Sequence, residues 1–433
     1  MIQGTGIKKV LERLFAPATQ QGMKKTKPTN PTRSKFPVLR QLCNLIPPFL
    51  VSKSAREKGV DKKARTFSVW SHFVALMYAQ FTHSNSLNDV SDGMQLNSGD
   101  LSTLRGATPP SRNNLSHANR TRDAAVAEDV FWKVLNHLQG LKPEFAWGRG
   151  RPARRFKRVI HAVDSSTIKL IMSCFSWAQH RRRKAAAKLH LRLNLQSFLP
   201  GYAIVDKAKG HDNQKARELC FGLKAGEIAV FDMAYVAYEH LNELTQRGVW
   251  WVSRVPVRSA YRVVKKLQSQ PKGKILKDEL IHMIGPKTKR LYPGTLRRVV
   301  ALVEVNGQEQ EMEFITNNLQ WSAQSIADLY KCRWQIEVFF KQIKQTLQLA
   351  DFLGYNLNAV RWQVWTALLT YVLLRFMAFL SQCNGSFARV WAFVRSGLWK
   401  RIDLVDLLRN CCGTAGRPVR LRAAPEQAYL PSF

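Results

Sequence analysis

Residues 322–347, SAQSIADLYKCRWQIEVFFKQIKQTL, decide how the rest of the sequence is interpreted. This stretch has no proline or glycine, Ser322 stands where an N-cap is expected, and apolar side chains recur at helical intervals. The recurring apolar residues are Leu329, Ile336, Phe340, Ile343 and Leu347. The pattern predicts one long helix that buries this apolar stripe.

A polar stripe lies beside the apolar one on the predicted helix. At about 100° per residue it contains Tyr330, Arg333, Glu337, Lys341 and Lys344. One carboxylate among cationic and hydrogen-bonding groups is suited to holding a metal with one residue and phosphates with the others. The alternative is a solvated helix face, in which Arg333, Lys341 and Glu337 only support the helix through i,i+4 pairs.

The composition points to a folded protein with a polyanionic partner. The chain has 433 residues, enough for two or three domains, and 45% of them are hydrophobic. Lys and Arg number 67 against 30 Asp and Glu, so the formal net charge is +37. Such an excess repels itself unless a polyanion lies against it, which favours nucleic acid, with an anionic membrane surface as the second candidate.

Two aspartates follow apolar runs in the middle of the chain. VIHAVDSSTIKLIM, from Val159, predicts a buried strand that ends at Asp164, then a turn and a second strand. Asp232 follows the apolar run Ile228–Phe231 and precedes a predicted helix. The alternative for each aspartate, and above all for Asp232, is that it caps the turn or helix that follows.

Asp164, Asp232 and Glu337 occur in the order D, D, E, with separations of 68 and 105 positions. Three carboxylates that converge would repel one another and raise one another's pKa, and divalent cations resolve this conflict. Oxygen ligands suit Mg2+, and two such ions assist in-line phosphoryl transfer. We therefore expect metal-dependent cleavage or transfer at DNA phosphates, provided that folding brings the three acids together.

The spacing Y-x2-R-x3-E-x6-K is complete in Tyr330, Arg333, Glu337 and Lys344, and Trp334 follows the arginine. It resembles the Y-R-E-K signature of DDE transposases from bacterial insertion sequences. The family's Asp-Ser/Thr motif is present as Asp164-Ser165-Ser166-Thr167, and SWAQHRRRKAAAKLH (176–190) is similar to a further family segment. The resemblance covers about residues 155–385, with a weaker similarity over residues 36–140.

The resemblance implies an RNase H-like fold, an α/β mixed sheet flanked by helices, with an inserted β-rich subdomain and an all-helical N-terminal domain. It implies that Asp164, Asp232 and Glu337 hold two Mg2+ ions, for which Mn2+ can substitute. Arg333 and Lys344 would bind phosphates, Tyr330 would donate a hydrogen bond to one, and Lys341 would contact DNA. For Trp334 two interpretations stay open, stacking on an extruded base or packing in the core.

The family's second motif commonly has the form D-R-G-Y, whereas this chain has Asp232-Met233-Ala234-Tyr235. The metal ligand is unchanged, but the phosphate contact of the family's arginine is in doubt. Between these motifs we expect strands at 188–196, 201–207 and 249–255. Two further strands are expected within LRRVVALVEV and EQEMEFITN.

We expect a chain of six parts. These are a basic flexible arm (1–35), a helical DNA-binding domain (36–145), the first part of the catalytic core (155–256), a β-rich insertion (257–318), the second part of the core (319–385) and a helical basic tail (386–433). A basic linker at 147–158 precedes the core. In the helical domain Ser111 would cap a helix rich in Arg and Asn, which suits phosphates and base edges or is an ordinary exposed helix.

The resemblance implies a transposase that binds the ends of an insertion sequence, cuts DNA through hairpin ends and joins 3′ ends to target DNA. Its partners would be the terminal inverted repeats, target DNA and a second copy of the chain. The alternatives are a metal-dependent nuclease without strand transfer and a non-catalytic DNA-binding protein. The absence of an apolar N-terminal leader and of paired cysteines suits a cytoplasmic, nucleoid-associated protein, and the apolar window 362–380 favours a buried helix over a membrane span.

Overall fold

The structure is a computed structural model, and it describes most of the chain between residues 32 and 411. The described ranges are 32–60, 66–147, 156–170, 179–181, 184–207, 212–256, 259–268, 270–305, 307–347, 349 and 352–411. Nearly all of the predicted basic arm, most of the 147–158 linker, part of the 176–190 segment and the end of the tail lie outside these ranges. The division into six parts stays a prediction.

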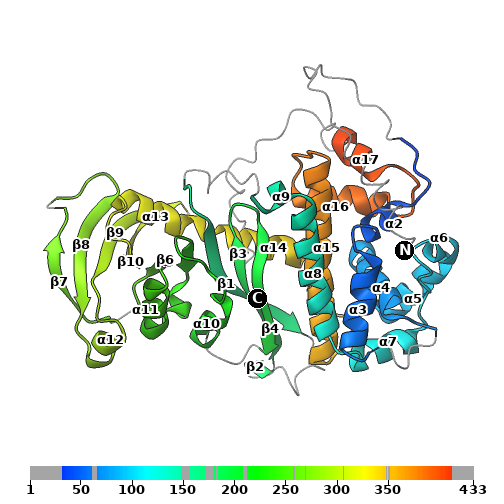
Figure 1. The fold of residues 1–433 in the computed structure, drawn as a ribbon, viewed down its shortest axis with the longest axis horizontal. Coiled ribbons are helices and arrows are strands. Elements are labelled where there is room, and N and C mark those ends of the chain that lie inside the picture. Colours follow the sequence, from blue (N-terminus) through cyan, green and yellow to red (C-terminus); the bar gives the residue numbers. More distant parts are fainter. Residues whose placement is uncertain are drawn as a thin grey trace.

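The N-terminal part of the described chain is helical, as the apolar periodicity indicates (Figure 1). Its helices are α2 (Val38–Cys43), α3 (Pro48–Glu57), α4 (Val69–Thr82), α5 (Leu87–Leu96), α6 (Ser98–Ser102), α7 (Arg112–Thr121), α8 (Ala125–Leu141) and α9 (Pro143–Trp147). The predicted cap of α7 is present, because the Ser111 side chain accepts a hydrogen bond from the backbone N–H of Asn114.

One ten-stranded sheet forms the other side of the molecule. Its strands are β1 (Ile160–Leu170), β2 (Gln179–Arg181), β3 (Lys184–Asn194), β4 (Leu199–Lys207), β5 (Ile228–Phe231), β6 (Trp250–Arg254), β7 (Tyr261–Lys266), β8 (Ile275–Met283), β9 (Leu296–Val305) and β10 (Gln308–Thr316). The order is β2-β3-β1-β5-β6-β10-β9-β8-β7, and β4 also pairs with β3.

The centre of the sheet has the mixed topology that the resemblance implies. β3 runs antiparallel to both β1 and β4, whereas β5 runs parallel to β1 and β6 runs parallel to β5. This is an RNase H-like arrangement, and the predicted fold class is confirmed. The strands from the predicted insertion, β7 to β10, do not form a separate sheet: β10 pairs with β6 and so extends the central sheet at that edge.

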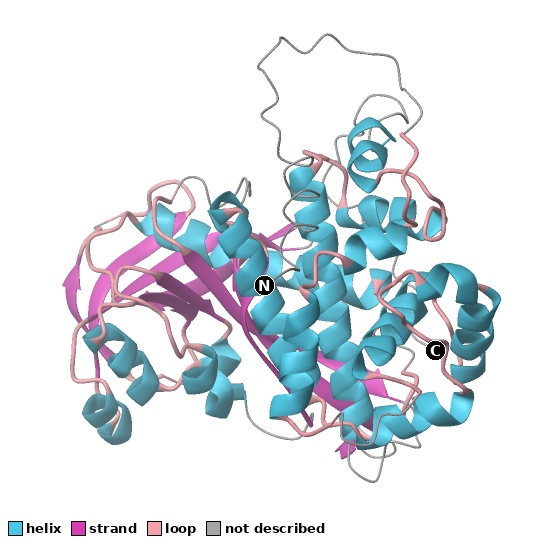
Figure 2. Ribbon diagram, turned by 45° about the vertical axis from the view of Figure 1, so that its right-hand side comes forward, coloured by secondary structure: helices cyan, strands magenta, loops and turns pink. Residues whose placement is uncertain are grey.

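Helices cover both faces of the sheet, and the alternation of side chains along each strand separates two cores (Figure 2). In β1, Ile160 and Ala162 belong to the core shared with the long helices, whereas Val163 belongs to the core beneath the shorter ones. The shorter elements are η3 (Asp212–Lys215), α10 (Ala216–Leu219), η4 (Met233–Tyr235), α11 (Tyr238–Gln246) and α12 (Pro286–Leu291).

The stretch 322–347 forms two helices instead of the single one predicted. Helix α13 (Ala323–Cys332) ends at Arg333, and α14 (Gln335–Thr346) begins after Trp334. Hydrogen bonds of the i→i+3 type replace the α-helical ones at the junction, because the N–H of Arg333 donates to Tyr330 and that of Ile336 donates to Arg333. The predicted apolar stripe is buried throughout.

Helix α15 (Leu357–Leu380) joins the two sides of the molecule. It contacts α4, α7 and α8 of the helical region and also strand β4. By length and composition it could cross a membrane, but 78% of its most apolar window is buried inside the protein. The expectation of a buried helix is therefore confirmed. Helices α16 (Phe387–Ser396) and α17 (Leu404–Cys411) pack beside it.

The described cysteines are not all thiols. Cys43, Cys220 and Cys332 are free and buried, but Cys383 is disulfide-bonded, which differs from the expectation of a reduced chain.

Candidate active site

Asp164 lies in β1 and Asp232 directly follows the neighbouring parallel strand β5, on the same face of the sheet. The register pairs Val163 of β1 with Phe231 of β5, so each aspartate comes directly after a paired residue. Successive side chains alternate between faces, which places Asp164 with Ile160 and Ala162 and places Asp232 with Ile228 and Val230. That face is covered by α13 and α14, the helices that supply Tyr330, Arg333 and Glu337.

The surroundings of Asp164 differ in one respect from the prediction. Asp164 was expected at a strand end followed by a turn, but β1 continues unbroken to Leu170 and the aspartate lies in its middle. Pairing with β3 explains the difference, because the register between the two strands runs without interruption from His161 to Leu170. The aspartate is thus held by a paired backbone on a central strand.

The capping alternative for Asp232 does not hold. Asp232 is the N-cap residue of η4, but its side chain makes no capping hydrogen bond. Instead, the Tyr330 hydroxyl donates to its Oδ1 over 3.4 Å. Burial raises the pKa of Tyr330 to about 12, so the hydroxyl keeps its proton and remains a donor.

Arg333 binds two of the three acids at once. Its Nη1 lies 2.7 Å from Oδ2 of Asp164, and its Nη2 lies 3.0 Å from Oε1 of Glu337. Arg333 is only 6% exposed, whereas the Glu337 side chain is 46% exposed. The predicted i,i+4 pairing of arginine and glutamate is therefore present, but its arginine is buried and also binds Asp164, so the pair does not lie on a solvated helix face.

The electrostatics of the cluster indicate that the acids are close enough to repel one another and that Arg333 does not fully balance their negative charge. Burial raises the pKa of the Asp164 carboxyl to about 6, although Arg333 and the backbone N–H of Ser165 act in the opposite direction. Asp232 and Glu337 raise it further by charge repulsion. A buried carboxylate with this deficit is suited to a further cation.

The donor chemistry fits a divalent ion, but the arrangement is not a ready-made site. Carboxylate oxygens are the ligands that Mg2+ prefers. Among the described residues, however, no group of three His, Cys, Asp or Glu side chains is placed to hold a metal ion. The Arg333 guanidinium instead occupies one oxygen of Asp164 and one of Glu337. Its Nε is buried and has no hydrogen-bond partner among the described residues, so the guanidinium is incompletely satisfied by them.

The other predicted DNA-binding residues lie along α14 and its junction with α13. Lys344 donates from Nζ to the backbone carbonyl of Thr167 over 2.6 Å, and burial lowers its pKa. Lys341 is exposed and pairs with none of the described residues. Trp334 is 40% exposed, which excludes the core-packing interpretation, and the Arg333 guanidinium lies 5.8 Å from its ring centroid.

A polar cluster behind the acids was not predicted from the sequence. The Lys188 ammonium lies 2.5 Å from Asp212, whose other oxygen accepts from the Ser165 hydroxyl over 3.4 Å. His190 contacts the Tyr235 hydroxyl over 2.8 Å, and burial lowers the pKa of His190 to about 4, so the ring is neutral. Ser165 follows Asp164 in β1. Lys188 and His190 belong to the quoted KLH segment, which was the one available signal.

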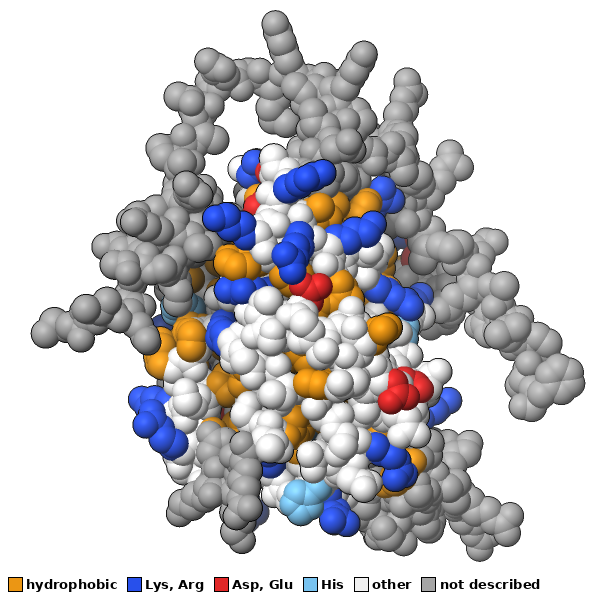
Figure 3. All heavy atoms as spheres, turned by 90° about the vertical axis from the view of Figure 1, so that its right-hand side faces the viewer, with side chains coloured by type: hydrophobic (Ala, Val, Ile, Leu, Met, Phe, Trp, Pro, Cys, Tyr) orange, Lys and Arg blue, Asp and Glu red, His pale blue; other side chains and the backbone are white. Residues whose placement is uncertain are grey.

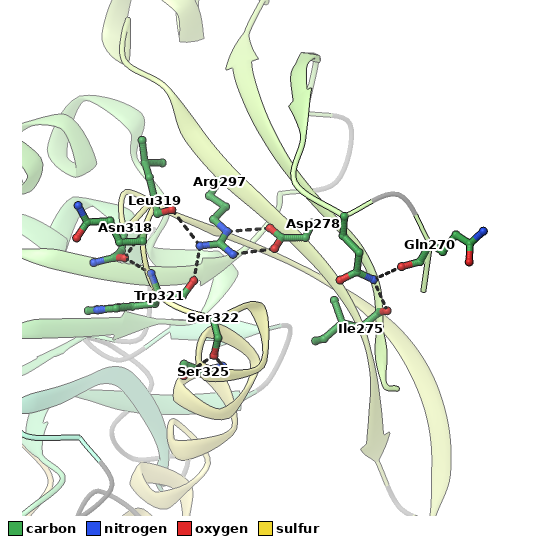
Figure 4. A network of polar contacts seen from close by, with 11 residues as sticks. Gln270, Ile275, Asp278, Arg297, Asn318, Leu319, Trp321, Ser322 and Ser325 are labelled. Atoms are coloured by element: carbon green, nitrogen blue, oxygen red, sulfur yellow. Dashed lines mark hydrogen bonds and ion pairs between the residues drawn. The ribbon is translucent and has the colours of Figure 1, made fainter. Parts of the chain in front are cut away.

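A second unpredicted network fixes the loop that leads into α13 (Figure 4). Arg297 of β9 forms a two-pronged ion pair with Asp278 of β8, through hydrogen bonds of 2.8 and 2.7 Å. Its remaining nitrogen donates to the carbonyls of Leu319 and Trp321. The buried arginine thus ties the outer strands to the start of the helix that carries Tyr330.

Comparisons with known families and sequences identify relatives of this chain. A family profile described as "Transposase DDE domain" matches residues 155–373, and one described as "Domain of unknown function (DUF4372)" matches residues 34–104. The chain is 28% identical to the y4zB transposase of Sinorhizobium fredii, over 69% of this chain and 81% of that one.

Two further relatives are more distant. A transposase for the insertion sequence element IS5377 of Geobacillus stearothermophilus is 27% identical, over 58% of this chain and 65% of that one. The transposase InsG for IS4 of Escherichia coli is 25% identical, over 44% and 43%. A solved piggyBac transposase synaptic complex with hairpin DNA aligns over 89% of this chain and 82% of that chain, with a TM-score of 0.41 and 9% identity.

Proposed function

Because this chain belongs to the DDE transposases of bacterial insertion sequences, we propose that it cuts DNA at the ends of its element and joins the 3′ ends to target DNA. Enzymes with this domain use divalent metal ions. For this chain we propose two Mg2+ ions, with Mn2+ as a substitute, held by Asp164, Asp232 and Glu337. The observation that carries the proposal is that Arg333 pairs with Asp164 and Glu337 while Tyr330, three residues before it, donates to Asp232.

When bound, such ions activate a water or a 3′-hydroxyl and stabilise the leaving oxygen of an in-line phosphoryl transfer. The chain would first release two carboxylate oxygens, because Arg333 now pairs with one oxygen of Asp164 and one of Glu337. We propose that a DNA phosphate draws Arg333 away, since a phosphate offers the guanidinium the same two-pronged pairing as a carboxylate. Arg333 would then bind the phosphate beside the cut.

Three neighbouring groups would hold the DNA in place. Lys341 is exposed and free to meet a phosphate, Lys344 would exchange its contact with the Thr167 carbonyl for one, and the exposed ring of Trp334 would stack on an unpaired base. Hairpin ends, a dimer on the DNA and a cytoplasmic, nucleoid-associated location belong to the same proposal.

The test is a cleavage assay with Mg2+ or Mn2+ on DNA that bears the element's ends, whose sequence follows from the inverted repeats flanking the gene. We expect Glu337→Ala to abolish cleavage and keep end binding, because in this proposal the glutamate would hold the metal ions and make no contact with the DNA. Glu144→Ala, which removes an exposed carboxylate of α9, is the matched control and should cut normally.

Retained cleavage by Glu337→Ala would remove this residue from the mechanism. Wild-type products that are cut but never joined to target DNA would favour the plain nuclease. Binding without any cleavage under either metal would favour the non-catalytic DNA-binding protein.

A further inference from the structure

A second polar cleft lies in the helical region, apart from the acids. It has a volume of about 530 Å3 and is lined by the start of α5, by α7 and by the loop before α15. The side chains that the argument uses are Asn88, Arg112, Asn119, Arg120, Tyr355 and Asn356. No Asp or Glu is among the described residues that line it, although the chain contains 30 of them.

The rim of the cleft is cationic. Arg112 and Arg120 are both exposed, and neither forms an ion pair with any described residue. They are eight residues apart on α7, which is about 12 Å along the helix axis. The end of the molecule formed by these helices shows Lys and Arg side chains scattered over an otherwise largely uncharged surface, with few acidic groups (Figure 3).

The floor of the cleft presents hydrogen-bond donors whose orientation is fixed by other contacts. Asn119 is 4% exposed, and its Oδ1 is bound to Nε2 of His72 over 2.8 Å. Burial lowers the pKa of His72 to about 3, so the ring is neutral and donates this bond. The Asn119 amide nitrogen is therefore the atom left for the cleft, and an added Cβ at Gly354 would lie 3.8 Å from it.

Asn356 is oriented in the same way. It is the N-cap of α15, and its Oδ1 accepts the backbone N–H of Ala359 over 2.7 Å. This cap leaves the amide nitrogen without a partner among the described residues. Gly354 allows the loop to approach so closely, because a Cβ at this position would meet the Ala359 side chain at 2.5 Å.

A cleft with two guanidinium groups, two fixed amide donors and no carboxylate selects a ligand rich in acceptors. DNA offers anionic phosphate oxygens on its backbone and acceptors such as purine N7 on its base edges. Tyr355, whose side chain is 59% exposed, adds an aromatic surface at the rim. We propose that this cleft is a second DNA-binding site, in which Arg112 and Arg120 bind phosphates while Asn119 and Asn356 contact base-edge acceptors.

This inference rests on the function proposed above for the choice of DNA, but its test does not depend on cleavage. Binding is measured by fluorescence anisotropy without divalent ions, in a Glu337→Ala background and over a series of salt concentrations. The probes are a duplex with the element end, the same duplex with 7-deazapurines, which lack N7, and a scrambled duplex of equal composition.

We expect the double variant Arg112→Gln/Arg120→Gln to weaken binding to all three duplexes about tenfold or more, and to reduce the salt slope by about 2. The control Lys287→Gln/Arg290→Gln removes the same charge from exposed positions on α12 and should change binding much less. An equal loss in both double variants would reduce the effect to net charge and overturn the site.

Asn356→Ser keeps an N-capping oxygen but removes the amide donor. It should leave the salt slope unchanged and lose most of the preference for the element end over the 7-deazapurine duplex. An unchanged preference, with a thermal melt equal to that of the parent, would overturn base contact by the cleft. A protein that binds through the cleft but never cuts would contradict the catalytic proposal and leave this one intact.

Discussion

The acid cluster (Asp164, Asp232 and Glu337) and the cleft lined by α5, α7 and the loop before α15 both contain arginines. These arginines differ in burial and in pairing. At the acid cluster Arg333 is buried and already paired with Asp164 and Glu337. At the cleft Arg112 and Arg120 are exposed and pair with none of the described residues. On the two proposals above, DNA would bind the cleft without a rearrangement of its arginines, whereas Arg333 would have to exchange carboxylates for a phosphate.

The comparison predicts that the cost of removing an arginine follows its burial and pairing. Arg297→Met should have the largest effect, because it leaves the Asp278 carboxylate buried without a partner. We expect a loss of about 3–5 kcal/mol in the free energy of unfolding, measured by urea denaturation. The double variant Arg297→Met/Asp278→Leu should recover much of this loss, and a double variant as unstable as the single one would contradict the account.

Next in size is the effect of Asp164→Asn on stability in metal-free buffer. The pKa of Asp164 in the folded chain, about 6, exceeds its ordinary value of 3.8, so folding favours the protonated form. The resulting stabilisation is fully present below about pH 4 and is lost as the pH rises through 6. The side chain is 14% exposed. Asn cannot ionise, so at pH 8 the variant should be more stable, by at most about 3 kcal/mol.

The matching measurement is the unfolding free energy of wild type and Asp164→Asn between pH 4 and 8, with a chelator present. The two curves should nearly coincide at pH 4, diverge as the pH rises to about 6 and stay a constant distance apart above it. A constant difference across the whole range would mean that the carboxylate is not short of positive charge.

The substitution Arg333→Gln should have a smaller effect, which is a gain in affinity for the metal ion. Arg333→Gln frees oxygens of Asp164 and Glu337, so we expect Mn2+ to bind the DNA-free protein about tenfold more tightly, as measured by calorimetry. The same variant should bind DNA at the cut more weakly. Unchanged Mn2+ affinity would show that Arg333 does not compete with the metal.

The smallest effect should come from the cleft. Arg120→Gln removes an exposed side chain that pairs with no described residue, so the unfolding free energy should stay within about 0.5 kcal/mol of wild type. A larger loss, seen in the same urea experiment as for Arg297→Met, would mean that Arg120 supports the helical region and is not held ready for a ligand.

The sequence predicted the elements of the site better than their exact form. Apolar runs located the strands before Asp164 and Asp232, and periodicity located α13 and α14, because these signals are local. The break at Arg333 was not predictable, since residues 322–347 contain no proline or glycine and the interruption belongs to the packing of two helices on one sheet. Strand β1 continues unbroken through Asp164 because it pairs with β3, and the local sequence of β1 does not reveal this pairing.

The sequence also did not show which groups the arginine side chains contact. A helical stripe shows that Arg333 and Glu337 share a face, but it does not reveal whether that face meets solvent or a carboxylate 169 residues away. For the same reason, only part of the cleft could be predicted from the sequence. The Arg- and Asn-rich helix was identified from residues 111–122, whereas Tyr355 and Asn356 join it only in the folded chain.

Helix α15 sets how far apart the two sites can be. It starts at the cleft, where Asn356 caps it and Ala359 lines it, and it goes on to contact strand β4 of the catalytic sheet. Twenty-four residues of α-helix measure about 36 Å, and this rod is buried for most of its length. It is therefore a stiff connection between the helical region and the sheet, and lengthening α15 by one turn should change how the proposed DNA-binding cleft is placed relative to the proposed active site.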